Sequence, residues 1–194
     1  ILIPAISVKR LEIQNKLAQF GTLSLLLIIL PYVLSNSLYY EIQLSEKHVS
    51  ESERTAMQWI AQNTPAESTF LLITGEPNGL CDSTSEWFPS LSERQSLATL
   101  QGNEWLQGKI FGQLVGNIQS LQACSRIGLQ CLLQDTNYFT TDFDYLYIST
   151  HTPTFNCETT DASDSTRSLI LELEDSAQFQ SVFNSDGAVI FSRK

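Results

Sequence analysis

Carboxylates and aromatic side chains alternate with small polar residues between Cys81 and Trp105 (CDSTSEWFPSLSERQSLATLQGNEW). Both tryptophans of this stretch directly follow a glutamate. Such pairs can grip a sugar ring, because an indole stacks on its apolar face while neighbouring polar groups bond its hydroxyls. The same residues could instead anchor a long loop to the core. The candidate ligand-binding residues are Glu86, Trp87, Arg94, Glu104 and Trp105.

No motif in the sequence specifies a reaction. It has no GxGxxG, no Walker loop, no GxSxG and no HExxH. A pair of carboxylates could hydrolyse a glycoside, but the sequence does not select one pair among many acids. Without a CxxC, and with His48 and His151 isolated, a metal site is not predicted either. We therefore predict no catalytic residue, no metal and no cofactor.

The four cysteines predict disulfides if the domain lies in an oxidising compartment. Four cysteines allow three connectivities. Cys124 and Cys131 flank a turn that contains Gly128, which favours their pairing and leaves Cys81 with Cys157 by elimination. Buried free thiols are the alternative.

A run of 24 uncharged residues, 17–40 (LAQFGTLSLLLIILPYVLSNSLYY), precedes this part of the chain. As a helix it would be about 36 Å long, enough to cross a hydrocarbon core of about 30 Å. Lys9, Arg10 and Lys16 lie before it, so the positive-inside rule places its N-terminal side in the cytoplasm. We predict a transmembrane helix over 17–44; a signal peptide and a buried helix are the alternatives.

Three regions follow from this topology. Residues 1–16 would be the end of a preceding span with a short cytoplasmic turn, and residues 45–194 an extracytoplasmic domain. The protein would then be integral to the cell membrane, with the lipid bilayer as a partner and everything after about residue 41 outside. A net charge of −10 argues against nucleic-acid binding through a basic patch.

Hydrophobic patterning in the outer region is typical of an α/β domain: a small mixed sheet with helices packed on it. The loops that follow strands 69–74 and 143–149 would leave the carboxyl ends of those strands. If the two strands are parallel neighbours, Cys81–Trp105 and His151–Asp164 flank one crevice. The other predicted elements are a helix capped by Ser50 and Glu53 and ending at Asn63, a loop over 75–95, a strand over 96–100, helices over 109–124 and 128–135, a helix or strand over 168–173, and hairpin strands over 179–183 and 188–192.

Several stretches together resemble a known family: SESERTAMQWIAQNTPAESTFLLITG after the apolar run, then EWFP-x-L-x-x-R, Q-G-x-EW, C-x6-CL, FDYLYIS and a final AVIF. They are similar to the C-terminal outer domain of large bacterial multi-spanning membrane proteins of the GT-C, glycosyltransferase-like type. The resemblance covers roughly residues 20–194. It implies an accessory domain that positions a glycan acceptor or a polyprenyl-phosphate sugar.

That family's catalytic carboxylate lies in its first outer loop, near the N-terminus, so no catalytic residue carries over to this sequence. The alternative function is a membrane-tethered extracytoplasmic binding or sensory domain without catalytic activity.

Overall fold

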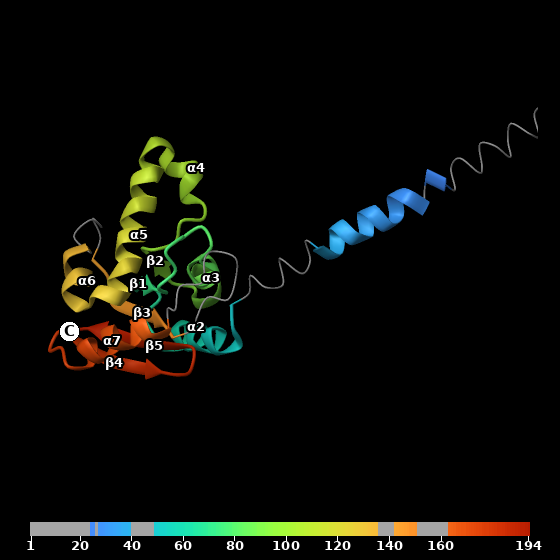
Figure 1. Ribbon diagram of the computed structural model, residues 1–194. Coiled ribbons are helices and arrows are strands. Elements are labelled where there is room, and N and C mark those ends of the chain that lie inside the picture. The colour runs from blue at the N-terminus through green and yellow to red at the C-terminus, as the bar shows by residue number, and fades with distance from the viewer. Residues whose placement is uncertain (1–23, 26, 40–48, 136–141, 151–162) are drawn as a thin grey trace, which may run out of the picture. The chain divides into compact units, whose positions relative to one another are not determined.

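The computed structural model describes residues 24–25, 27–39, 49–135, 142–150 and 163–194 (Figure 1). The chain divides into two compact units, Ile1–Glu46 and Lys47–Lys194.

In the first unit, residues 27–39 are helical, and large apolar side chains such as Leu27, Ile28 and Leu30 are exposed. Within the described ranges, no helix is both long and apolar enough to cross a membrane. Much of the segment predicted to span the bilayer, 17–44, lies outside those ranges. The transmembrane helix therefore stays a prediction.

The second unit is built on a five-stranded mixed sheet in the order β2-β1-β3-β5-β4 (Figure 1). β1 is parallel to both β2 and β3, while β5 runs antiparallel to β3 and β4. The predicted mixed α/β fold is confirmed, and the strands that begin at Thr69 and Tyr145 are parallel neighbours. The strands are β1 Thr69–Ile73, β2 Gln95–Ser96, β3 Tyr145–Ser149, β4 Phe179–Asn184 and β5 Ala188–Arg193.

Helices cover both faces of this sheet. Phe70 and Leu72 of β1 pack with α2 (Glu51–Asn63) and α3 (Ser83–Ser92). Leu71 and Ile73 alternate to the other face, where they pack with α5, α6 and α7. A strand buried on both faces explains the uninterrupted apolar run TFLLI. The remaining helices are α4 Asn103–Gln107, the 3₁₀ turn η1 Gly108–Ile110, α5 Phe111–Ile127, α6 Leu129–Asp135 and α7 Ser163–Glu174.

The loop predicted over 75–95 is wrong, because it contains helix α3. Asp82 caps that helix, accepting a hydrogen bond from the Ser85 amide at 3.0 Å. Pro89 lies inside it and cannot donate to the Ser85 carbonyl one turn earlier. The hydroxyl of Thr99 donates to that carbonyl instead, at 2.7 Å. A contact from outside the helix thus compensates for the proline.

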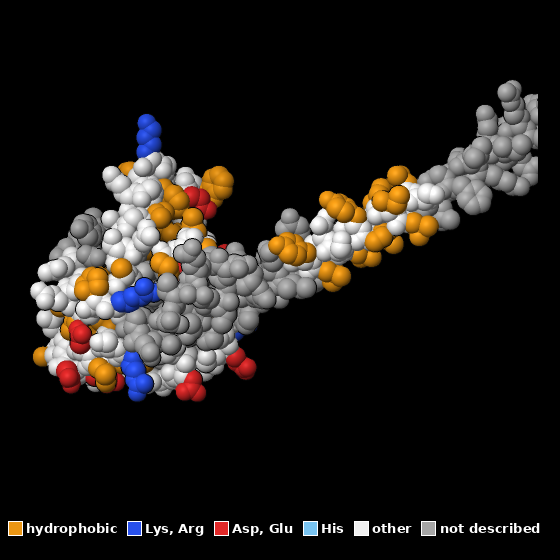
Figure 2. All heavy atoms as spheres, viewed as in Figure 1, with side chains coloured by type: hydrophobic (Ala, Val, Ile, Leu, Met, Phe, Trp, Pro, Cys, Tyr) orange, Lys and Arg blue, Asp and Glu red, His pale blue; other side chains and the backbone are white. Residues whose placement is uncertain are grey.

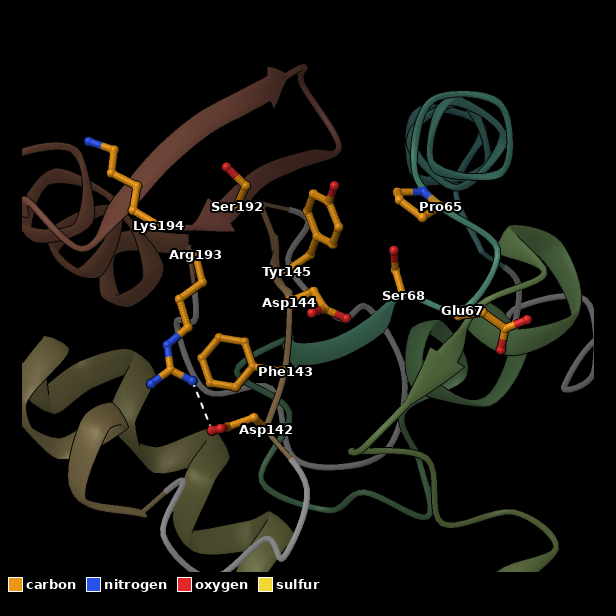
Figure 3. Close-up of a pocket in the computed structure, with 10 residues that line it drawn as sticks. All are labelled: Pro65, Glu67, Ser68, Asp142, Phe143, Asp144, Tyr145, Ser192, Arg193 and Lys194. Carbon is orange, nitrogen blue, oxygen red and sulfur yellow. Dashed lines mark hydrogen bonds and ion pairs between the residues drawn. The ribbon is translucent and has the colours of Figure 1, made fainter.

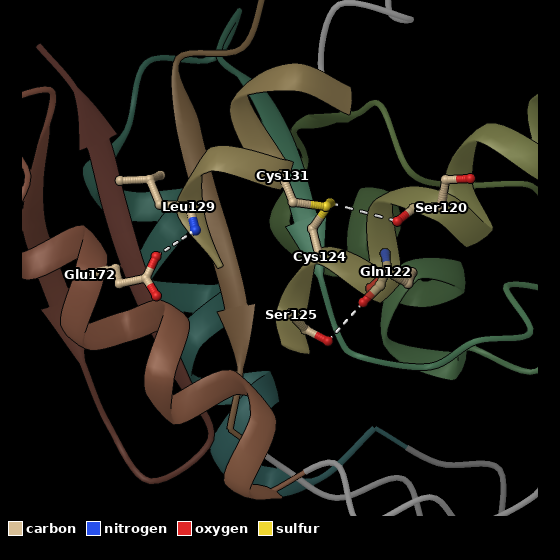
Figure 4. The surroundings of a disulfide bond; sticks show 7 residues. All are labelled: Ser120, Gln122, Cys124, Ser125, Leu129, Cys131 and Glu172. Carbon is tan, nitrogen blue, oxygen red and sulfur yellow. Dashed lines mark hydrogen bonds between the residues drawn. A yellow bond between two sulfur atoms is a disulfide. The ribbon is translucent and has the colours of Figure 1, made fainter. Parts of the chain in front are cut away.

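A disulfide joins α5 to α6 between Cys124 and Cys131, confirming the predicted pair (Figure 4). On the same helix pair, the Glu172 carboxylate of α7 accepts a bond from the Leu129 amide at 2.7 Å, at the start of α6. Cys81 is also disulfide-bonded. Its predicted partner, Cys157, lies outside the described residues.

Replacing Cys124 and Cys131 together by alanine should lower the free energy of unfolding by about 2–3 kcal/mol. The disulfide closes a loop with a sequence separation of 7. Removing it raises the conformational entropy of the unfolded chain, which for a loop of that size stabilises the unfolded state by about this free energy. Urea unfolding followed by circular dichroism measures the change. Ser120→Ala, at an exposed position one turn earlier on α5, is the control, and an unchanged midpoint in the double variant would contradict the prediction.

Candidate functional site

The carboxyl ends of β1 and β3 lie side by side, with Ile73 paired to Ile148. Beyond these strand ends, on the side of α2 and α3, lies a cluster of buried polar side chains. We call this set the polar cluster. It consists of Glu53, Thr74, Asp82, Thr84, Ser85, Tyr147 and Ser149, all buried.

Glu53 is at the centre of the polar cluster and is only 2% exposed. One carboxylate oxygen accepts bonds from the Ser50 amide and hydroxyl, at 3.1 and 2.8 Å, which completes the predicted capping box of α2. The other oxygen accepts bonds from the hydroxyls of Thr84 in α3, at 2.8 Å, and Ser149 in β3, at 2.9 Å. One side chain therefore connects two helices and a strand.

Asp82 is the second buried carboxylate, 5% exposed. It accepts bonds from the Thr74 hydroxyl and the Ser85 hydroxyl, both at 2.6 Å, in addition to the Ser85 amide. Burial raises the pKa of Asp82, and the negative charge of Glu53 adds to the rise. Burial likewise raises the pKa of Glu76, the second residue after Thr74, and the charge of Asp82 contributes.

Tyr147 places a phenol in this acidic environment. Its pKa is raised well above 10 by burial and by the charges of Glu53 and Asp82, so the hydroxyl keeps its proton. Within the described part of the chain that hydroxyl has no hydrogen-bond partner. The described residues also contain no group of three or more His, Cys, Asp or Glu side chains that could hold a metal ion. The polar cluster links secondary-structure elements through buried hydrogen bonds.

Gln122 of α5 fixes the chain where it leaves β1. Its carbonyl oxygen accepts bonds from the amides of Thr74 and Gly75, at 2.8 and 3.0 Å, and its amide donates to the Leu72 carbonyl at 2.9 Å. These bonds satisfy main-chain groups that no neighbouring strand can reach.

Arg94, predicted to bind ligand, is buried, and its side chain caps the C-terminal end of helix α2. Its guanidinium donates to the carbonyls of Ala61 and Thr64, at 2.9 and 2.6 Å, and to the Thr64 hydroxyl at 3.0 Å. These acceptors lie at the C-terminal end of α2, where the last carbonyls of a helix need donors. A ligand could reach Arg94 only if these bonds broke.

The other four candidates are exposed. Glu86 and Trp87 lie on α3, which packs against α2; Glu104 and Trp105 lie on the short α4, next to α5. Trp87 is 49% exposed and Trp105 is 85% exposed. The two Glu–Trp pairs are thus available to a ligand, on separate helices. Most of the predicted second wall of the crevice, His151–Asp164, lies outside the described residues.

A shallow pocket of about 700 Å³ lies at the opposite, amino end of β1 and β3 (Figure 3). Arg193 crosses it: the guanidinium bonds Asp142 at 2.9 Å and lies 5.3 Å from the centre of the Phe143 ring. Both charged groups are well exposed, so their pairing contributes little to stability. No sequence pattern indicated this pocket, because its walls come from three distant segments. They are 65–68, 142–145 and 192–194.

No protein-family model matches the chain, and no match was found among curated proteins or solved structures. The resemblance to the outer domain of GT-C-type membrane proteins therefore stays a prediction from the sequence motifs.

Relative to the wild type, Asp82→Asn should gain stability as pH rises. Asparagine keeps one side-chain oxygen for the helix cap but loses the other acceptor oxygen, which is a cost at every pH. The part of the stability difference that changes with pH comes from the charge. Burial raises the folded-state pKa of this carboxyl above the ordinary 3.8. The stability that the carboxyl contributes is therefore complete below about pH 3.8, the pKa in the unfolded chain. It is lost as pH rises through the raised pKa.

Urea unfolding between about pH 4 and pH 8 measures this difference in free energy of unfolding, over a window that starts at the ordinary aspartate pKa. Asp186→Asn, at an exposed position in the β4–β5 turn, controls for the change in net charge. A difference that stays constant over this range, or that changes in favour of the wild type, would refute the prediction.

Glu53→Gln should destabilise the fold by about 2 kcal/mol, because the amide nitrogen cannot accept the bonds that the carboxylate accepts. Glu51→Gln is a matched control: it removes a charge from the same first turn of α2, at an exposed position. It should cost about 0.5 kcal/mol through the helix dipole alone. Equal losses in the two variants, measured by chemical unfolding, would show that the buried bonds of Glu53 contribute nothing.

Proposed function

We propose that this chain is the outer-face part of an integral membrane glycosyltransferase-like protein. Its α/β domain positions a glycan acceptor or a polyprenyl-linked sugar at the membrane surface, and the chemistry belongs to another part of that protein.

The apolar segment supports membrane attachment. Residues 27–34 (LIILPYVL) are eight successive apolar residues in helical conformation. Eight residues make more than two helical turns, so apolar groups occupy every side of the helix. Such a surface needs lipid or protein around it. The Cys124–Cys131 disulfide supports a location outside the cytoplasm, where such bonds persist.

The observation that carries the binding role is the exposure of the two tryptophans. Trp105 and Trp87 each follow an exposed glutamate, and neither is used in the core. An exposed indole beside a carboxylate offers a sugar an apolar ring to stack on and an acceptor for its hydroxyls.

The buried carboxylates support positioning rather than catalysis. Glu53 and Asp82 are surrounded by donors from the protein's own hydroxyls and amides. Their bonds connect structural elements, and both acids are buried. A role in holding a substrate through exposed aromatic side chains needs neither of them.

Trp87→Ala and Trp105→Ala should each weaken glycan binding about fivefold, equivalent to about 1 kcal/mol of lost stacking. Binding of soluble oligosaccharides and of a short-chain polyprenyl-phosphate sugar to the whole chain in detergent is measured by calorimetry. Leu171→Ala, at an exposed position on α7, is the control. Circular dichroism should show an unchanged fold, because both indoles are exposed.

Two outcomes would contradict the proposal. One is that the wild type binds no glycan saturably, which would favour a tethered sensory domain. The other is that both tryptophan variants bind as tightly as the wild type.

A further inference from the structure

Residues 103–117, comprising α4, η1 and the first seven residues of α5, contain no buried side chain. We call this segment the arm. The first buried residue of α5 is Ile118, and the helix packs on the sheet from Leu121 onward. Figure 1 shows α4 and the start of α5 at the end of the domain that lies away from the strands.

The arm is apolar in spite of its exposure. Trp105 is 85% exposed, Leu106 83% and Ile110 61%. Figure 2 shows hydrophobic side chains gathered over this end of the domain, with a cationic side chain projecting beside them. Glu104 and Lys109 are its only charged residues and cancel each other. Exposed apolar groups gathered in this way mark a contact surface.

No other described element covers the arm. A Cβ atom added at Gly112 or at Gly116 of α5 would meet nothing within 4 Å, and the same holds for Gly102 and Gly108 at the ends of α4. No described residue therefore lies against the arm at these positions, whereas Phe111, Leu114 and Val115 on α5 are half-buried.

We propose that the arm docks on the bilayer surface, with Trp105, Leu106 and Ile110 in the interfacial layer and Lys109 on anionic headgroups. Tryptophan and long apolar side chains favour this layer, and a nearby cation adds attraction to anionic lipid. This inference rests on the membrane attachment in the proposed function and names the surface that orients the domain.

Chain length and charge favour the bilayer over other occupants. The apolar run ends at Tyr40 and α2 begins at Glu51, so even a fully extended connection would hold the domain within about 40 Å of the membrane. A chain of net charge −10 is repelled by anionic lipid over most of its surface. The arm has no net charge and carries Lys109 in η1, so it is a face that can approach.

Fluorescence of Trp105 in liposomes tests the docking. Trp59→Phe and Trp87→Phe leave Trp105 as the sole tryptophan of the whole chain, reconstituted in phosphatidylcholine and phosphatidylglycerol with doxyl-labelled lipid. We expect blue-shifted emission that the doxyl group quenches. Leu106→Ser with Ile110→Ser should abolish the quenching. Leu171→Ser with Val182→Ser, exposed apolar positions on α7 and β4, should leave it unchanged.

Lys109→Glu should reduce the quenching in the anionic liposomes and leave it unaltered in phosphatidylcholine alone. Emission typical of an indole in water, without quenching, would overturn the inference. Protection of Trp105 only at high protein-to-lipid ratio would also overturn it, since a second copy would then cover the arm.

The same variants separate this inference from the glycan proposal. The Leu106→Ser and Ile110→Ser pair keeps Trp105, so it should still bind soluble oligosaccharide. Quenching without any glycan binding would remove the binding role and leave the docking in place. Glycan binding without quenching would remove the docking and leave the binding role in place.

Discussion

The fold of the α/β domain depends on a buried carboxylate that needs donors. Glu53 loses its hydration at the start of α2, and burying an ionised group without partners costs several kcal/mol. Thr84 and Ser149 supply hydroxyls from positions 31 and 96 residues away in sequence. These bonds can form only when α2, α3 and β3 are all in place. Glu53 thus makes the α2–α3 side of the sheet one cooperative unit.

The same network determines which groups remain for a ligand. In an α/β sheet, the carboxyl ends of neighbouring parallel strands are the usual place for binding. Here the carboxylates at that edge, Glu53 and Asp82, are bonded to the protein's own hydroxyls. The aromatic groups still free to contact other molecules lie elsewhere, on α3 and α4. The buried hydrogen bonds and the exposed aromatic side chains therefore involve different residues.

Local signals predicted much of the fold. The capping box at Ser50 and Glu53, the apolar strand at Phe70, the β4–β5 hairpin and the Cys124–Cys131 pair all depend on residues close in sequence, and all are confirmed. Helix α3 was missed because Pro89 indicates a break, and the Thr99 contact that compensates for it comes from outside the helix. The role of Arg94 at the end of α2, 30 residues away, was equally hidden. Side chains that act over such distances leave no local pattern.

Helix α5 shows how one sequence pattern can describe two environments. Its apolar residues recur at helical spacing from Ile110 through Leu121, which by itself predicts one continuous buried face. The sheet, however, covers only the part from Leu121 onward. Before it, Phe111, Leu114 and Val115 are half-buried, and the stripe ends in the exposed Ile110, joined by Trp105 and Leu106 of α4. A pattern that runs past the edge of its own core points to a second surface that covers the remainder, and we propose that this surface is a bilayer.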